Sequence, residues 1–192
     1  GKCPFCREPM LLQVNGHEEK NNKRIMKRVK LNDPVAMLQM GGRSKIDGDY
    51  DKAIEYFTKA AALGDARSNF QLGGMYYKGE FFEKDMEKAI HHLEKAAIGG
   101  HPMARHTLGC HEKDNGNVEK AVKHLIISAK VGYEKSMQML WRLYSSGHVT
   151  KTDLDATLRA HQSAIDATKS AQREEAEAYY QLLSVHRGKQ QE

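Results

Sequence analysis

The stretch Glu87-Lys88-Ala89-Ile90, followed by Ala96-Ala97 and Gly100, decides the fold of this chain because the same pattern occurs three times. The other copies are Asp51-Lys52-Ala53-Ile54 with Ala60-Ala61 and Gly64, and Glu119-Lys120-Ala121-Val122 with Ser128-Ala129 and Gly132. A pattern that repeats at this spacing is typical of an array of helical hairpins. Such arrays stack their hairpins side by side and present a long surface to a partner.

A second pattern precedes each of these stretches and predicts the first helix of each hairpin. Small residues recur at Ala36, Ser68, Ala104 and Ser136. Large apolar residues recur at Met40, Leu72, Leu108 and Leu140, with offsets of 32, 36 and 32 residues. The first of these helices has a clear start, because Asp33 suits an N-cap and Pro34 suits the first helical position. We therefore expect four hairpins between residues 32 and 170.

Glycines in this pattern predict how the helices of a hairpin meet. Glycine in a helix costs about 1 kcal/mol relative to alanine, so repeated mid-helix glycines indicate close approach of a second helix. These glycines are Gly41, Gly73 and Gly109. Those that follow the second helices are predicted left-handed C-caps, and they are Gly64, Gly100 and Gly132. In the fourth hairpin Trp141 takes the glycine position and Thr157 the alanine position, which predicts different inner packing there.

The segments on either side of the repeats are predicted to differ from them. Residues 1–16 form a turn-rich head that ends in a turn at Asn15-Gly16, and residues 17–31 form a basic linker helix. Residues 171–187 form an amphipathic capping helix, and residues 188–192 a frayed tail. The predicted fold class is all-α, a right-handed α-α superhelix (solenoid) of about four hairpins with a C-terminal capping helix.

Composition sets the class of protein and the kind of partner. With 29% charged and 40% hydrophobic residues, the chain of 192 residues suits a soluble folded protein. No apolar run approaches the roughly 18–20 residues that a membrane span needs. A net charge of +5 permits acidic partners without requiring nucleic acid.

The cysteines indicate the compartment. Three cysteines, two of them in a Cys-x-x-Cys pair, favour a reducing compartment, so we expect an intracellular protein, cytoplasmic or nuclear. The chain begins at Gly1 without an initiator Met, and we expect it to be a fragment.

The clearest copy of the repeat carries a family resemblance. Its motif residues are Leu72-Gly73, Tyr76, Gly79, Lys84-Asp85, Lys88-Ala89, Ala96-Ala97 and Gly100. This pattern resembles the Sel1-like repeat, a tetratricopeptide-type repeat, and the resemblance extends roughly over residues 32–170. Copies one and three depart from it, with Ser44 and Glu112 in place of Tyr76. The resemblance implies a superhelix of helix pairs that acts as a protein-protein interaction scaffold or adaptor.

A second resemblance lies in the head. Cys3-Pro4-Phe5-Cys6 resembles the closing Cys-Pro-x-Cys pair of a RING-type zinc finger, as in RING and Sel1-repeat proteins of diatoms. Cys3 and Cys6 would then be two zinc ligands, and the other six would lie upstream of Gly1. This implies a RING-type E3 ubiquitin ligase that binds a ubiquitin-conjugating enzyme and holds substrate on its repeats. The alternative is two ordinary thiols in a disordered leader. A thioredoxin-like redox pair is disfavoured, because no βαβ pattern follows the two cysteines.

The expected partner-binding surface comes from the first helices, which line the concave face in tetratricopeptide-type arrays. The groove-facing positions are Arg67, Gln71, Tyr77, Lys78, His106, Lys113 and Arg142. This set is basic with one aromatic ring, and it suits an acidic or carboxylate-ended peptide because Arg and Lys donate charge-assisted hydrogen bonds to carboxylates.

Other candidate sites have simpler interpretations. His106 and Cys110 lie four residues apart and could hold a metal, but His106 aligns with Leu38 and Phe70, which favours packing. His92 aligns with Tyr56, an aromatic packing position. The basic stretch 20–30 could bind phosphate or nucleic acid or act in nuclear localisation, but it lacks interleaved aromatic residues and suits a solvated helix.

Catalysis finds little support in the sequence. A phosphate-cradling glycine-rich loop and a nucleophile elbow are both missing. Two hypotheses therefore remain, a non-catalytic scaffold and a ubiquitin ligase whose enzyme activity depends on the upstream zinc finger.

Overall fold

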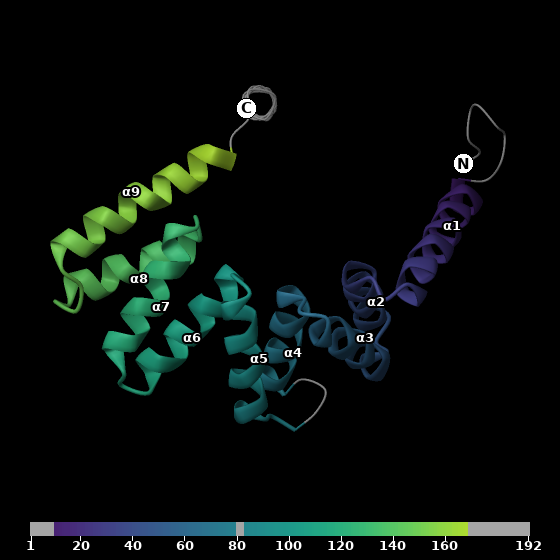
Figure 1. Cartoon of the computed structure of the whole chain (residues 1–192), viewed down its shortest axis with the longest axis horizontal. Coiled ribbons are helices and arrows are strands. Elements are labelled where there is room, and N and C mark those ends of the chain that lie inside the picture. The colour runs from purple at the N-terminus through teal and green to yellow at the C-terminus, as the bar shows by residue number, and fades with distance from the viewer. Residues whose placement is uncertain (1–9, 80–82, 169–192) are drawn as a thin grey trace, which may run out of the picture. The chain divides into compact units, whose positions relative to one another are not determined.

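The computed structural model describes residues 10–79 and 83–168, with side chains from residue 20 onward. Within these ranges the chain forms α-helices and no strands (Figure 1). The helices are α1 (Met10–Lys30), α2 (Pro34–Ile46), α3 (Tyr50–Ala62), α4 (Ala66–Lys78), α5 (Met86–Ile98), α6 (Pro102–Asp114), α7 (Val118–Lys130), α8 (Glu134–Ser145) and α9 (Lys151–Thr168). They form the four predicted hairpins, α2/α3, α4/α5, α6/α7 and α8/α9. The chain divides into two compact units, one ending at Ala104 and one beginning at Arg105.

The repeated small and large residues form the core, as predicted. The small residues of the first helices are fully buried, and they are Ala36, Ser68, Ala104 and Ser136. Leu72, Leu108 and Leu140 are at most 4% exposed, whereas Met40 is half-buried. The second helices bury Ala53, Ala89 and Ala121 completely. The first three hairpins therefore close on the same set of positions.

The mid-helix glycines lie where a second helix comes close, which confirms the prediction. A Cβ atom on Gly73 would lie 2.9 Å from Leu93 Cγ and 3.2 Å from the Ala89 carbonyl oxygen. The equivalent Cβ on Gly41 would lie 2.6 Å from Phe57. The glycines after the second helices have φ angles of 85°, 82° and 88°, the left-handed conformation predicted for Gly64, Gly100 and Gly132.

The predicted start of the first hairpin is also confirmed. Asp33 caps α2, and its carboxylate accepts hydrogen bonds from the backbone N–H groups of Val35 (2.9 Å) and Ala36 (3.2 Å). Pro34 takes the first helical position, where a backbone N–H is not needed.

The N-terminal helix begins earlier than predicted. α1 starts at Met10 and continues through Asn15-Gly16, so the turn predicted there is wrong. The residues after Pro9 include strong helix formers, and one Asn-Gly pair does not cost enough to break so long a helix. Cys3 and Cys6 lie outside the described residues, as do the capping helix predicted at 171–187 and the tail at 188–192.

The fourth hairpin packs differently from the others, as the sequence predicts. Trp141 occupies the glycine position, and α9 packs against both α7 and α8. His161 takes the position of Phe57 and Leu93, and it is 4% exposed. Its Nδ1 lies 2.7 Å from the Ala129 carbonyl oxygen of α7, and its Nε2 lies 3.1 Å from a carboxylate oxygen of Glu134 of α8. A polar side chain therefore holds α9 where an apolar one holds the other second helices.

Candidate functional site

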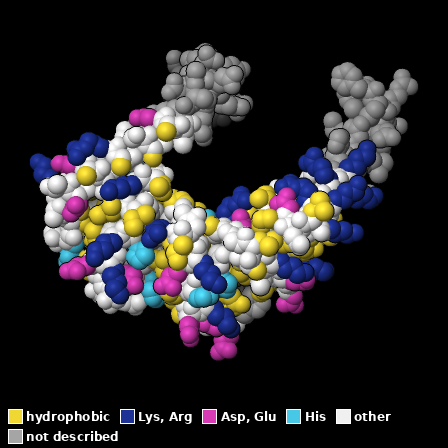
Figure 2. Space-filling view, in the orientation of Figure 1, with side chains coloured by type: hydrophobic (Ala, Val, Ile, Leu, Met, Phe, Trp, Pro, Cys, Tyr) yellow, Lys and Arg dark blue, Asp and Glu magenta, His cyan; other side chains and the backbone are white. Residues whose placement is uncertain are grey.

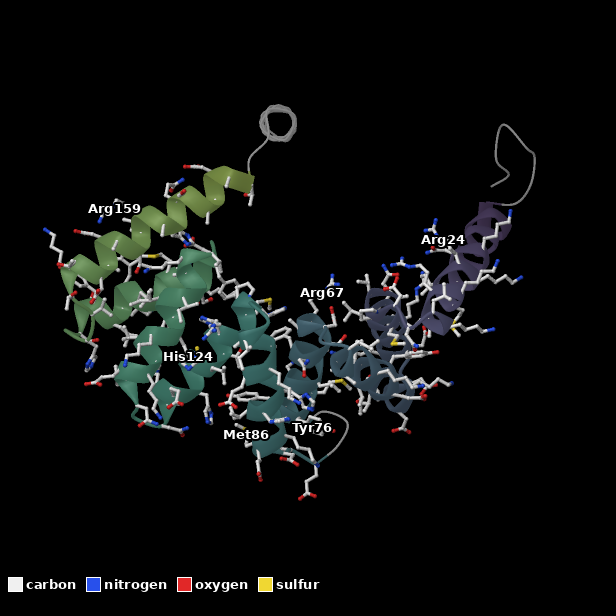
Figure 3. The ribbon with its side chains drawn as sticks, in the orientation of Figure 1. Arg24, Arg67, Tyr76, Met86, His124 and Arg159 are labelled. Atoms are coloured by element: carbon white, nitrogen blue, oxygen red, sulfur yellow. The ribbon has the colours of Figure 1, made fainter. Side chains whose placement is uncertain are left out.

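The first candidate surface is one face of α4. Arg67, Gln71 and Lys78 fall at spacings of four and seven residues, which places them on one side of a helix with 3.6 residues per turn. Arg67 is 53% exposed, and its Nη2 lies 3.5 Å from a carboxylate oxygen of Asp65, the N-cap of the same helix. Lys78 is exposed and Gln71 is half-exposed (Figure 3 labels Arg67). This face presents two cationic groups and one amide.

Tyr77 differs from its neighbours on α4. It lies about 100° round the helix from Lys78. The ammonium group of Lys84 lies 5.6 Å from the centroid of its ring, a cation-π contact. The ring is half-buried, so Tyr77 forms the edge of this surface and not its centre.

His106, on α6 in the second unit, is largely committed to the fold. Its Nδ1 lies 2.9 Å from Ser136 Oγ, and that hydroxyl donates to Ser128 Oγ at 2.9 Å. Its ring packs edge-on against Tyr133, with centroids 5.2 Å apart. Burial lowers the pKa of His106, which favours the neutral imidazole. These contacts support the packing interpretation.

The alignment of His106 with Phe70 has a structural counterpart. Phe70 stacks on His101 with ring centroids 4.3 Å apart, and His101 precedes α6 as Tyr133 precedes α8. The same position in two hairpins therefore packs an aromatic ring against the residue before the next first helix. His92 also packs, because it stacks on Tyr76 and lies 3.0 Å from Asn69 Oδ1.

The remaining predicted residues lie on α6 and α8. Lys113 shares a face of α6 with His106, seven residues away, and its ammonium group lies 3.0 Å from a carboxylate oxygen of Asp114. Arg142 is exposed on α8. The structure thus places Arg67, Gln71, Tyr77 and Lys78 on α4 in the first unit. The other predicted residues lie in the second unit, and they are His106, Lys113 and Arg142.

In the part of the chain that the structure describes, the Cys110 and His106 pair comes nearest to a metal site or a nucleophile. Cys110 Sγ lies 3.6 Å from His106 Nε2. Within residues 10–79 and 83–168, no group of three or more metal-ligating side chains of His, Cys, Asp or Glu is present. Burial raises the pKa of the Cys110 thiol, which keeps it protonated and weakly nucleophilic.

Sequence analysis weighed the basic stretch 20–30 as a phosphate-binding patch but did not connect it with Arg43. Arg24 and Arg28 of α1 and Arg43 of α2 line the same cavity in the first unit. The available signal was spacing, since Arg24 and Arg28 lie four residues apart and therefore share one face of a helix. Which helix would pack on α1 could not be deduced from that face alone.

Comparison with known proteins identifies the repeats. The Sel1 repeat family matches residues 35–65 and 66–101, which are the first two hairpins. This chain contains Sel1 repeats. Its fold resembles a Sel1 repeat protein from Oxalobacter formigenes, with a TM-score of 0.65 and 27% identity over 77% of this chain and 64% of that one. A protective antigen of uropathogenic Escherichia coli with an SLR fold gives a TM-score of 0.62 and 25% identity over 77% of this chain and 33% of that one. The predicted all-α solenoid fold is therefore confirmed.

Three curated relatives share part of their length with this chain. The alginate biosynthesis protein AlgK of Pseudomonas syringae pv. tomato is 33% identical over 110 residues, which is 55% of this chain and 23% of that protein. DAP3-binding cell death enhancer 1 of Rattus norvegicus is 36% identical over 83 residues, 43% of this chain and 16% of that protein. The putative beta-lactamase HcpC of Helicobacter pylori is 36% identical over 56 residues, 29% of this chain and 19% of that protein. This chain thus spans less than a quarter of each relative. Among its described helices, none is both long and apolar enough to cross a membrane.

Proposed function

We propose that this Sel1-repeat chain is a non-catalytic scaffold that binds an acidic protein or peptide segment through the first helices of its hairpins. The observation that carries the proposal is the face of α4 that contains Arg67, Gln71 and Lys78. Exposed Lys and Arg groups donate charge-assisted hydrogen bonds to carboxylates, and a helix whose backbone is already ordered limits the entropy cost of binding to its side chains. The name of the rat relative, DAP3-binding cell death enhancer 1, describes binding to another protein, which supports a partner-binding role for the repeats.

The packing of the hairpins supports a division of labour between their helices. In the first unit, the second helices α3 and α5 contribute Phe57 and Leu93 to the core, each 1% exposed. The first helix α4 contributes Leu72 to the core from one side and presents Arg67 and Lys78 on another. Partner recognition by α4 is therefore compatible with an unchanged core.

Chemistry at the Cys110 and His106 pair is disfavoured by its electrostatics. Nucleophilic cysteines need a lowered thiol pKa, and burial raises the pKa of this one. Burial also lowers the pKa of His106, which disfavours the imidazolium that would stabilise a thiolate beside it. A binding function accounts for the described residues better than a catalytic one.

A peptide-binding assay tests this proposal. The probe is a fluorescent 12-residue peptide library with Asp or Glu at half of its positions, compared with a library that has Asn or Gln there. We expect the acidic library to bind more tightly. The double variant Arg67→Ala/Lys78→Ala should bind it about 2- to 30-fold more weakly, since each exposed ion pair contributes about 0.2–1 kcal/mol.

The control is Lys95→Ala, which removes an exposed cation from the second helix α5. It should leave the affinity unchanged, and circular dichroism should show the same helix content for all variants. Equal binding of the acidic library by the double variant and the wild type would exclude the α4 face. Equal binding of the two libraries by the wild type would exclude an acidic partner.

A narrower proposal rests on the Cys3-Pro4-Phe5-Cys6 sequence alone. In it, Cys3 and Cys6 contribute two thiolates to a RING-type zinc finger, and the repeats hold the substrate of an intracellular E3 ubiquitin ligase. Zinc content of the protein expressed from its complete coding sequence, compared with a Cys3→Ser/Cys6→Ser variant, tests the ligands. Ubiquitin transfer from a charged conjugating enzyme tests the activity. Equal zinc content in the two proteins would remove this proposal.

A further inference from the structure

Helices α1 and α2 pack against each other, and one face of each helix borders their line of contact. Each contributes residues at i, i+3, i+4 and i+7, the spacing of one helix face. Together they line an open cavity of about 470 Å³. The lining residues are Asn21, Arg24, Ile25 and Arg28 of α1, and Gln39, Gly42, Arg43 and Ile46 of α2. Ile25 is buried in this set, 5% exposed, whereas Arg24 and Arg28 are exposed at the mouth of the cavity and Arg43 is half-buried.

The three arginines differ in how they are satisfied. Arg28 is paired with Asp33, at 2.6 Å from Nη2 and 2.7 Å from Nε to the same carboxylate oxygen. Arg24 donates to Asn21 Oδ1 at 3.3 Å. Arg43 has a buried Nη1 with no hydrogen-bond partner among the described protein atoms. A buried cationic N–H group without an acceptor lowers the stability of the fold, and a ligand that accepts a hydrogen bond from it removes this cost.

The charge around the cavity is unbalanced. Three guanidinium groups line the cavity, and none of the described lining residues is acidic. The nearby carboxylate of Asp33 pairs with Arg28 and balances one of the three positive charges. Lys and Arg side chains gather over α1 in Figure 2. Guanidinium forks bind phosphate and carboxylate oxygens through two parallel hydrogen bonds. The amide groups of Asn21 and Gln39 add neutral donors at the same cavity.

The shape of the cavity favours an anion attached to a larger molecule. A Cβ atom on Gly42 would meet nothing within 4 Å, so space remains open above α2. Ile46 at the rim is 86% exposed and offers an apolar contact to whatever flanks the anion. A bare inorganic ion would leave both features unused.

We propose that the α1/α2 cavity is a binding site for a phosphorylated side chain of a protein partner, held by Arg24, Arg28 and Arg43. A phosphomonoester carries about −1.5 to −2 charges near pH 7, which matches the excess of two positive charges better than one carboxylate does. Recognition of phosphorylated motifs by arginine clusters is a recurring mode of peptide binding. This site is independent of the α4 face, because it lies on other helices and needs no acidic peptide there.

The first test follows arginine side chains by NMR on the full chain. The probe is inorganic phosphate, titrated against chloride at constant ionic strength and pH while the ¹⁵Nε resonances are recorded. Those of Arg24, Arg28 and Arg43 should shift saturably, and that of Arg159, exposed on α9 (Figure 3), should not. Unsaturable shifts shared by all arginines would overturn the proposal.

The second test identifies the source of the phosphate. The immobilised chain is offered a peptide library with a central phosphoserine and mixed flanking residues, and the same library without phosphate. We expect at least about tenfold preferential retention of the phosphorylated library, because a charge-assisted bidentate contact is lost without it. An affinity for the phosphorylated peptides no higher than that for inorganic phosphate would overturn the proposal of a protein partner. Binding to phosphoinositide vesicles in place of peptides would overturn it as well.

Two variants connect the binding to the cavity. Arg43→Gln should abolish the preference for phosphopeptides without lowering the melting temperature, since it removes a buried donor that has no acceptor. Gly42→Glu should also abolish it, by placing a carboxylate in the open space above α2. Arg159→Gln is the matched control and should bind as the wild type does. Undiminished phosphopeptide binding by both cavity variants would place the anion elsewhere.

Discussion

Adjacent glycines in the middle of α4 provide a paired test of how the hairpins pack. Gly73 is in contact with α5, and a Cβ atom there would lie 2.9 Å from Leu93 Cγ and 3.2 Å from the Ala89 carbonyl oxygen. Gly74 is its neighbour in the same helix, and a Cβ atom there would meet nothing within 4 Å. Alanine at each position therefore gives the same gain in helix propensity but a different change in packing.

The expected magnitudes follow from these contacts. Gly74→Ala should raise the free energy of unfolding by about 1 kcal/mol through helix propensity alone. Gly73→Ala gains the same amount but overpacks the contact with α5, which costs about 1–3 kcal/mol. Leu93 is 1% exposed and cannot move aside without disturbing the core. The two variants should therefore differ by about 1–3 kcal/mol, with Gly73→Ala the less stable.

Thermal unfolding followed by circular dichroism measures this difference. For a chain of this size, 1 kcal/mol corresponds to about 2–4 °C in melting temperature. Gly74→Ala should melt about 2–4 °C above the wild type, and Gly73→Ala should melt at or below it. Gly73→Leu should melt lower still. An equal rise in melting temperature for the two alanine variants would refute close packing at Gly73.

Further predictions concern His161 of α9 and the N-caps of three helices. His161→Ala removes the contacts of α9 with the Ala129 carbonyl oxygen and should destabilise the second unit by about 1–3 kcal/mol; hydrogen exchange should show faster exchange in α9 and none of this change in α4 or α5. Three N-cap carboxyl groups have pKa values lowered from 3.8, namely Asp33 through the Arg28 side chain, Asp49 through the Lys52 side chain and Asp85 through the Lys88 backbone N–H. A lowered folded-state pKa stabilises the fold above the unfolded pKa of 3.8, and this stabilisation is lost as pH falls through the folded value. Urea unfolding between pH 5 and about pH 2 should therefore depend less steeply on pH in an Asp33→Asn/Asp49→Asn/Asp85→Asn variant; an unchanged slope would contradict the assignment.

The hairpin fold could be predicted because its determinants are local and repeated. Glycine at Gly73 and alanine at Ala89 recur at matching positions, so each copy supports the interpretation of the others. The difference in the fourth hairpin was also predictable from Trp141. The contacts of His161 were not, because they depend on where α9 comes to lie when α8 cannot be approached closely. The start of α1 was misjudged because an Asn-Gly pair indicates a turn only when the neighbouring residues do not favour a helix.

The candidate site was only partly predictable. The positions of Arg67, Gln71 and Lys78 on one face of α4 follow directly from helical spacing. Whether His106 was available to a partner could not be decided from spacing, because its bond to Ser136 joins residues thirty positions apart. The cavity between α1 and α2 was missed for the same reason, since the seam between two helices depends on tertiary packing.

The most direct test of partner recognition is to map where an acidic peptide touches the chain. The measurement is a backbone amide NMR titration of the full chain with the tightest-binding member of the acidic library. We predict that the perturbed amides cluster on the first helices, with Arg67, Gln71 and Lys78 of α4 among them. Perturbations confined to the second helices α3, α5 and α7 would contradict the account.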